Sequence, residues 1–131
     1  MSEHDALVEV AESLREALAA HDLPRLAALL DPAVRWGGEE DTETTCRNRE
    51  DVLRWYEGLH AAGVRTHVGE VSAHQAITLA TRVDWPDEDD PDEERPAELF
   101  HVFRVRNGLI YDIRGYDNRR QALDAATTHA T

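Results

Sequence analysis

The stretch FHVFRVRNGLIYDIRGYD, residues 100–117, decides the fold, because it is the clearest β-hairpin signal in the chain. Apolar and polar residues alternate on both sides of Asn107-Gly108, a dipeptide that is typical of tight hairpin turns. The open question is how many residues form the loop, since a shift of one residue turns every side chain to the other face of the sheet.

A three-residue loop, residues 106–108, gives the cleaner separation of apolar and charged side chains. In that register Phe103 faces Tyr111 and His101 faces Ile113, so one face is apolar apart from the histidine. A two-residue loop would mix charges and apolar residues on both faces. The pattern therefore predicts the three-residue loop and places a lone histidine on an apolar wall.

The segments before this hairpin read as helices first and strands afterwards. Apolar residues recur at helical spacing, with N-caps at Asp22 and Asn48 and a helix stop at Gly63. The expected helices cover residues 4–20, 22–31 and 48–63; the expected strands cover residues 33–36, 64–74 and 76–85, and the hairpin follows. After Asn118 we expect one or two helical turns and a frayed tail at residues 124–131. This order predicts an α+β domain with helices packed on a curved antiparallel sheet.

Length and composition exclude several classes of protein. A chain of 131 residues is expected to form one domain, and a net charge of −13 argues against nucleic acid and anionic membranes as partners. All 14 basic residues are arginine, so neither Schiff-base chemistry nor a P-loop lysine is available. The single cysteine, Cys46, excludes an internal disulfide and a cysteine-based zinc site. No signal peptide or membrane-spanning run is recognisable, and we expect a cytoplasmic protein.

An acidic segment, residues 87–94, separates the expected strands that end at Trp85 and begin near Leu99. Clustered carboxylates repel one another, so we interpret the segment as a solvated loop rather than a metal site. The seven histidines show no His-x-x-x-His spacing, and the sequence predicts neither a metal nor a cofactor.

Three segments, DPAVRW (31–36), CRNREDVL (46–53) and FHVFRVRNGLIYDIRGYDNRRQAL (100–123), together resemble the nuclear transport factor 2-like superfamily and its SnoaL-like branch. The resemblance extends from about Leu7 to Leu123. It implies a sheet wrapped into a cone, three helices closing its side and a pocket at the open end. It also implies a homodimer formed through the outer face of the sheet and a small hydrophobic molecule as the ligand.

The residues that carry chemistry in this superfamily are only partly matched here. SnoaL-like polyketide cyclases pair a histidine with an aspartate on the last strand; His101 matches the histidine, but the aspartate position falls on Gly115. Asp117, two residues further on, is a possible substitute. Limonene epoxide hydrolase uses an Arg-x-Asp pair, which Arg82 and Asp84 resemble, with a third member that again falls on Gly115.

The resemblance to ketosteroid isomerase is weaker. Its general base corresponds to Gly37 and its tyrosine donor to Leu14, so a mechanism of that type is not expected.

The sequence leaves the orientation of the predicted site residues open. Arg82 and Asp84 share one face of their strand and point either into the cone or into solvent. His101 is either a proton carrier or a structural histidine bonded to the backbone. The remaining predicted residues are pocket wall or ordinary core, except that Asp117 could instead cap the last helix: Trp36, Trp55, Phe103, Tyr111 and Asp117.

Two functions follow from these alternatives. In the first, the protein is a cofactor-independent cyclase, isomerase, dehydratase or epoxide hydrolase acting on an apolar substrate. Asp84 is then the base, Arg82 orients it and His101 is the second proton carrier. In the second, the same cone is a non-catalytic ligand-binding or dimerisation module.

Overall fold

The computed structural model describes residues 3–38, 40–43, 45–74, 76–84, 98–116 and 118–128. The acidic segment at 87–94 and Asp117, both singled out from the sequence, lie outside these residues.

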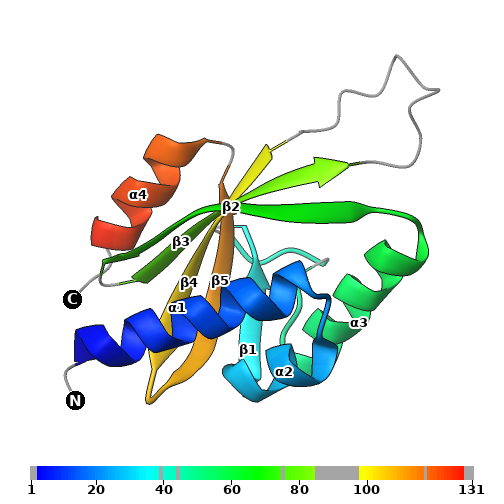
Figure 1. The fold of residues 1–131 in the computed structure, drawn as a ribbon, viewed down its shortest axis with the longest axis horizontal. Coiled ribbons are helices and arrows are strands. Elements are labelled where there is room, and N and C mark those ends of the chain that lie inside the picture. The colour runs from blue at the N-terminus through cyan, green and yellow to red at the C-terminus, as the bar shows by residue number, and fades with distance from the viewer. Residues whose placement is uncertain are drawn as a thin grey trace.

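The described residues form four helices and a five-stranded sheet (Figure 1). Along the chain they are α1 (Glu3–Ala19), α2 (Leu23–Leu29), β1 (Leu30–Gly37), α3 (Arg49–Ala61), β2 (Arg65–His74), β3 (Ala76–Asp84), β4 (Glu98–Arg106), β5 (Leu109–Tyr116) and α4 (Arg119–Thr128). The strand order is β1-β5-β4-β3-β2; neighbours are antiparallel except β1, which runs parallel to β5. The expected α+β class with a curved sheet is confirmed, but the sheet is mixed rather than wholly antiparallel.

The three-residue loop predicted for the β4–β5 hairpin is wrong. Arg106 pairs with Leu109, so the loop is Asn107-Gly108, with φ of 56° and 78° at its two residues. Positive φ at both positions is the geometry of a type I′ turn, which Asn-Gly favours.

A bulge at Tyr111, rather than a longer loop, places the apolar and the charged side chains of the hairpin on opposite faces. Val105 pairs with Ile110 and Arg104 with Asp112, which leaves Tyr111 as the extra residue on β5. Beyond the bulge His101 lies opposite Gly115, not opposite Ile113 as expected. The prediction failed because a hydrophobic pattern cannot tell one extra residue in the loop from one extra residue in the strand.

The helix ends follow the local chemistry that the sequence indicated. Asp22 and Asn48 accept hydrogen bonds from the backbone N–H groups three residues later, which fixes the starts of α2 and α3. Gly63 has φ of 94° just after α3, where glycine is the least strained residue. Helix α4 continues to Thr128, so residues 124–128, which we expected to fray, are helical.

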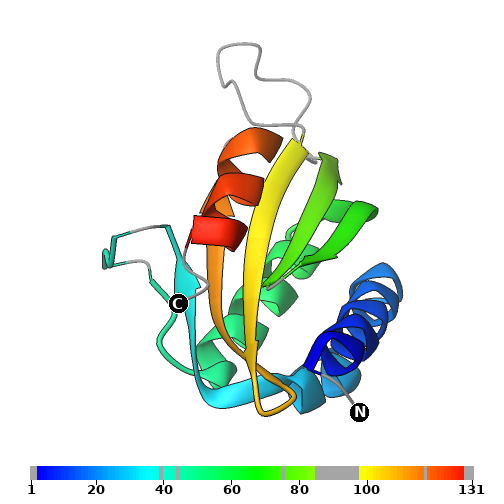
Figure 2. The same ribbon diagram turned by 90° about the vertical axis from the view of Figure 1, so that its left-hand side faces the viewer.

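The helices cover both faces of the sheet, and Figure 2 shows α1 and α4 on its opposite sides. Helices α1, α2 and α3 pack on the inner face and enclose the main core, which contains Leu14, Leu30, Val34, Val52, Ile77, Phe103, Ile110 and Ile113. Alanines of α4 pack against the outer face in a smaller core: Ala76, Phe100, Val102, Ala122, Ala125 and Ala126. The fourth helix therefore covers part of the outer face, through which the resemblance implied a homodimer contact.

Candidate functional site

A cavity of about 110 Å³ lies on the inner face of the sheet. Strands β2, β3 and β4 form one side of it, and α3, the end of α1 and Trp36 of β1 form the other. Its lining is mostly apolar and consists of Leu18, Trp36, Trp55, Tyr56, Leu59, Val64, Thr66, Val68, Leu79, Thr81, Val83, Leu99, His101 and Phe103. Alternation along the strands selects these residues, because every second side chain of each strand faces inward.

Aromatic rings from α3 and β1 form one end of this cavity. The ring centroids of Trp36 and Trp55 are 4.6 Å apart, and those of Trp36 and Tyr56 are 4.8 Å apart. Trp55 is 44% exposed although it belongs to this cluster, whereas Trp36 is buried. The indole of Trp55 therefore lies where the cavity meets the surface.

His101 is the imidazole in the cavity wall. Leu79, His101 and Gly115 are register partners across β3, β4 and β5, so the three residues form one row on the inner face. The Trp36 ring approaches the imidazole edge-on, with centroids 5.5 Å apart. Burial lowers the pKa of His101 to about 4, because a protonated ring at this position would carry a positive charge that water cannot solvate. The imidazole is therefore neutral at pH 7 and can accept a proton or a hydrogen bond.

The other polar groups in the lining are hydroxyls and indole N–H groups. Burial raises the pKa of Tyr56, so its phenol stays protonated and can act as a hydrogen-bond donor. Thr66 and Thr81 add two hydroxyls from β2 and β3. None of the residues described as lining the cavity is a carboxylate.

The structure brings together four of the residues predicted as site residues: Trp36, Trp55, His101 and Phe103 all line the cavity. Tyr111 does not, because the bulge turns it to the hairpin end, where the Arg106 guanidinium lies 4.5 Å above its ring. This placement does not support a ligand-binding role for Tyr111.

Arg82 and Asp84 lie on the solvent side of β3. Their side chains are 62% and 57% exposed, while the alternate residues Thr81 and Val83 line the cavity. Asp84 Oδ2 lies 2.8 Å from His67 Nε2 and 3.9 Å from Arg82 Nη2, so the group is a surface cluster. The placement does not support a role for Asp84 as base or for Arg82 as its orienter inside the cavity.

The two glycines at family carboxylate positions differ in the space around them. A Cβ at Gly37 would lie 2.9 Å from Thr45 Oγ1, so a side chain there would have to displace Thr45. A Cβ at Gly115 would lie 3.5 Å from His101 Nε2, which is ordinary contact. Position 115 can therefore accept a side chain next to the imidazole, and position 37 cannot without rearrangement.

Sequence reasoning missed the contributions of β2 and of the end of α1 to the cavity. Thr66 and Val68 alternate with polar residues along β2, and this signal was available, but it does not reveal which elements converge. Leu18 lies within the helix expected at residues 4–20, but its place at the cavity depends on the packing of α1 against β2, which is tertiary.

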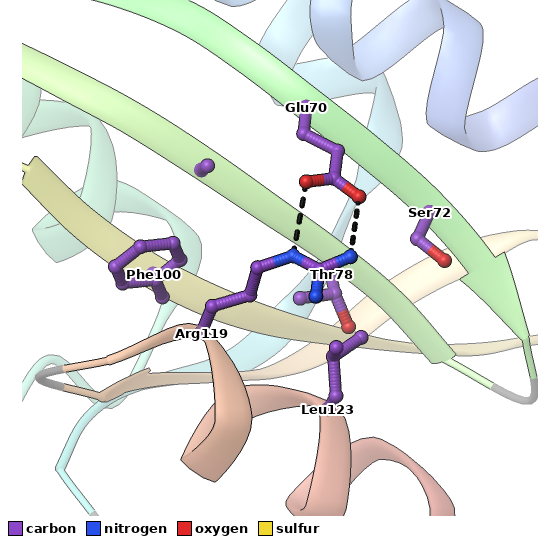
Figure 3. Close-up of a pocket in the computed structure, with 7 residues that line it drawn as sticks. Glu70, Ser72, Thr78, Phe100, Arg119 and Leu123 are labelled. Atoms are coloured by element: carbon purple, nitrogen blue, oxygen red, sulfur yellow. Dashed lines mark hydrogen bonds and ion pairs between the residues drawn. The ribbon is translucent and has the colours of Figure 1, made fainter.

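A further hollow lies on the outer face, between α4 and strands β2 to β4 (Figure 3). Arg119 of α4 makes two hydrogen bonds to Glu70 of β2, at 2.7 and 3.0 Å, and their side chains lie beside Phe100, Thr78 and Leu123. The hollow has a volume of about 10 Å³, which is enough for roughly one water molecule. The ion pair attaches α4 to the sheet and leaves no room for a substrate.

Among the described residues, no group of three or more His, Cys, Asp or Glu is placed to hold a metal ion. In the same part of the chain, no helix combines the length and apolarity required to cross a bilayer.

A family model described as "SnoaL-like domain" matches residues 10–113. This match covers the helices and strands that build the cavity. No curated protein is significantly similar to the chain in sequence.

Several solved structures share the fold at low sequence identity. An NTF2-like protein of unknown function from Mesorhizobium loti has a TM-score of 0.69 at 16% identity, covering 88% of this chain and 93% of its own. An LEH-like epoxide hydrolase from M. tuberculosis has a TM-score of 0.63 at 14% identity, covering 95% of this chain and 92% of its own. A candidate polyketide cyclase from Sinorhizobium meliloti has a TM-score of 0.63 at 16% identity, covering 88% of this chain and all of its own. At these identities the likeness concerns the fold alone.

Proposed function

The chain belongs to the SnoaL-like domain family, and we propose that it binds a small apolar molecule in the inner cavity and that His101 transfers a proton of that molecule. The observation that carries this proposal is one neutral imidazole in an otherwise mostly apolar wall. A few convergent polar groups in an apolar cavity are typical of small-molecule sites.

The size of the cavity limits the part of the ligand that it encloses. Drug-sized ligands occupy pockets of roughly 300–1,000 Å³, whereas a dry apolar cavity of about 150 Å³ holds a benzene molecule. At about 110 Å³, this cavity suits a single small ring rather than the fused rings of a steroid or an aromatic polyketide. We therefore propose a monocyclic or short-chain ligand.

With His101 as the one base among the described lining residues, an isomerisation is the best supported of the four reaction types considered. A neutral His101 can take a proton from a carbon next to a carbonyl and return it to another carbon, which is an isomerisation that needs no cofactor. The protonated phenol of Tyr56, the hydroxyls of Thr66 and Thr81 and the indole N–H groups are lining groups able to donate a hydrogen bond to the enolate oxygen. Epoxide hydrolysis by the Arg-x-Asp arrangement is less well supported, because Arg82 and Asp84 lie on the solvent side.

The experiment is proton exchange in deuterated water, which detects base catalysis without knowledge of the product. Cyclohex-2-enone carries exchangeable protons next to a carbonyl, and its exchange is followed by NMR with the wild type, His101→Gln and Asp84→Asn. We expect exchange with the wild type and Asp84→Asn, and none above background with His101→Gln. Exchange that persists in His101→Gln would refute the role of His101.

A binding function without turnover is the second candidate, favoured by the lack of a carboxylate among the described lining residues. It predicts that cyclohex-2-enone quenches the fluorescence of Trp36 and Trp55 but undergoes no exchange.

A homodimer remains part of the proposal. Because α4 packs on β3, β4 and β5 of the outer face, a partner on that face would contact α4 as well as the strands. Sedimentation of the purified protein over a range of concentrations tests this.

A further inference from the structure

A second, larger cavity of about 270 Å³ lies beside the first, where the ends of α1 and α3 meet the start of β2. Its lining consists of Leu18, Ala19, Ala20, His21, Tyr56, Leu59, His60, Val64, Arg65 and Thr66. Five of these residues also line the first cavity: Leu18, Tyr56, Leu59, Val64 and Thr66. The two cavities therefore adjoin along these five side chains.

The second cavity has basic groups at its outer end. The rings of His21 and His60 are stacked, with centroids 3.8 Å apart and an angle of 16° between their planes. Arg65 Nη1 donates hydrogen bonds to the backbone oxygens of His60, at 2.9 Å, and Val64, at 3.0 Å, which holds the guanidinium beside this stack. The backbone at His21 has φ of 50°, a conformation that is uncommon for residues other than glycine. In this conformation the His21 ring lies against the His60 ring.

No acidic side chain lines this cavity in the described part of a chain whose net charge is −13. The cross-strand neighbour of Arg65 is Asp84, but its carboxylate lies 2.8 Å from His67 on the neighbouring surface. Arg65 takes part in no ion pair within the described residues, although acidic residues outnumber basic ones by 27 to 14 overall.

The neighbouring basic groups disfavour a positive charge on His60. The pKa of His60 is lowered, first by desolvation and then by the charges of Arg65 and His21. An anion placed among the three groups would remove this repulsion and would find N–H donors on each of them.

From this arrangement we infer that the second cavity binds the carboxylate of an apolar acid whose ring occupies the first cavity. The inference rests on the proposed function, since it places the apolar part of the ligand in the wall that contains His101. It narrows the substrate class to small cyclic or aromatic carboxylic acids.

The chemistry favours a carboxylate over other anions. One permanently charged guanidinium matches a single negative charge, and its planar fork can donate two parallel hydrogen bonds to a carboxylate. A phosphate dianion would need further fixed cations, and Arg65 is the one arginine in this lining.

The test compares 3-phenylpropanoate with its neutral amide, 3-phenylpropanamide, by the quenching of tryptophan fluorescence. The variants are Arg65→Gln and His60→Gln, and the matched control is Arg54→Gln on α3, whose side chain is 77% exposed and lies outside both cavity linings. The ratio of the two affinities is measured within each variant, so a general distortion of the protein cancels.

We expect the wild type and Arg54→Gln to bind the acid roughly three- to tenfold more tightly than the amide, as for a partly exposed charge pair. In Arg65→Gln the ratio falls to about one, and in His60→Gln it falls by a smaller factor. Equal affinities in the wild type would overturn the inference and leave the proposed function intact, because the amide still binds. A preference for the acid that survives both substitutions would overturn the placement of the carboxylate. Binding of neither compound would overturn the inference and the proposed function together.

Discussion

Gly115 lies opposite His101 across strands β4 and β5, and the imidazole occupies the space next to the missing side chain. A Cβ at position 115 would lie 3.5 Å from Nε2 and 3.6 Å from Cδ2 of His101. The glycine therefore brings no charge to a ring that is already desolvated, and nothing from β5 offsets the cost of protonating it.

Replacing Gly115 with aspartate should raise the pKa of His101. A carboxylate beside the ring favours the imidazolium and opposes the effect of burial that lowers the pKa to about 4. We expect a rise of at least about one pKa unit, measured by following the imidazole C–H signals by NMR across pH.

Gly115→Ala is the matched control, because it adds the same Cβ without a charge. Its His101 should titrate as in the wild type. If His101 titrates at the same pH in Gly115→Asp and Gly115→Ala, the carboxylate at position 115 does not lie close to the imidazole. If Gly115→Asp shifts the pKa of His101, turnover should also be sought in this variant, because it carries a histidine–aspartate pair like the one expected for SnoaL-like cyclases.

Burial of neutral His101 also makes stability depend on pH. The unfolded chain protonates this histidine below pH 6.5, whereas the folded protein does so only below about 4. The contribution of the neutral ring is therefore complete above pH 6.5 and is lost as the pH falls toward 4. The loss is about 1.4 kcal/mol per pH unit, or about 2 kcal/mol at pH 5.

The measurement is urea unfolding of the wild type and His101→Phe at pH 7 and pH 5. All other residues are the same in the two proteins, so the change with pH in the difference between their stabilities isolates His101. The stability of the wild type should fall relative to His101→Phe between the two pH values. A constant difference would mean that His101 is as accessible to protons when folded as when unfolded.

The sequence predicted most of the fold because its signals there were local. Caps at Asp22 and Asn48, the stop at Gly63 and the change in hydrophobic period fixed element types without knowledge of the packing. The register of the hairpin was missed, since a bulge at Tyr111 and a longer loop produce the same alternation of faces.

The site was predicted only in part, for a different physical reason. His101 and Phe103 could be assigned to the inner face because their neighbours on the same face are apolar. Along β3, charged residues such as Arg82 and Asp84 also alternate with apolar ones. Alternation alone does not tell which of the two faces of the strand is the inner one, because that depends on where the helices pack. The basic group of His21, His60 and Arg65 was missed because His21 lies about 40 residues from the other two, and the contact between the end of α1 and the end of α3 depends on tertiary packing.

Asp84→Asn should leave ligand binding unchanged. The side chain is 57% exposed, and its partner His67 is 52% exposed, so the pair contributes about 1 kcal/mol or less to stability. Thermal melting with and without cyclohex-2-enone should show the same ligand-induced shift in the variant and the wild type. Loss of the shift would indicate that Asp84 reaches the cavity after all.

Asp112 should be far more important for stability than any exposed carboxylate. It is 7% exposed on the outer face, and three guanidinium groups surround it. Arg114 Nε lies 3.0 Å from its carboxylate, Arg35 Nη1 lies 3.7 Å away, and Arg104 Nε lies 3.9 Å away. Asp112→Asn keeps the shape but removes the negative charge that these three ion pairs share. Because removing one partner of a buried ion pair leaves an uncompensated charge, we expect a loss of about 3 kcal/mol in the free energy of unfolding.

Asp41→Asn is the matched control, since Asp41 also pairs with Arg35 but its side chain is 51% exposed. Water can solvate Arg35 on that side, so the loss should be much smaller than for Asp112→Asn. Urea unfolding of both variants at pH 7 measures the difference. Equal losses would mean that the three arginines around Asp112 are as well solvated as Arg35 is beside Asp41, and that the ion pairs of Asp112 do not stabilise this face of the sheet.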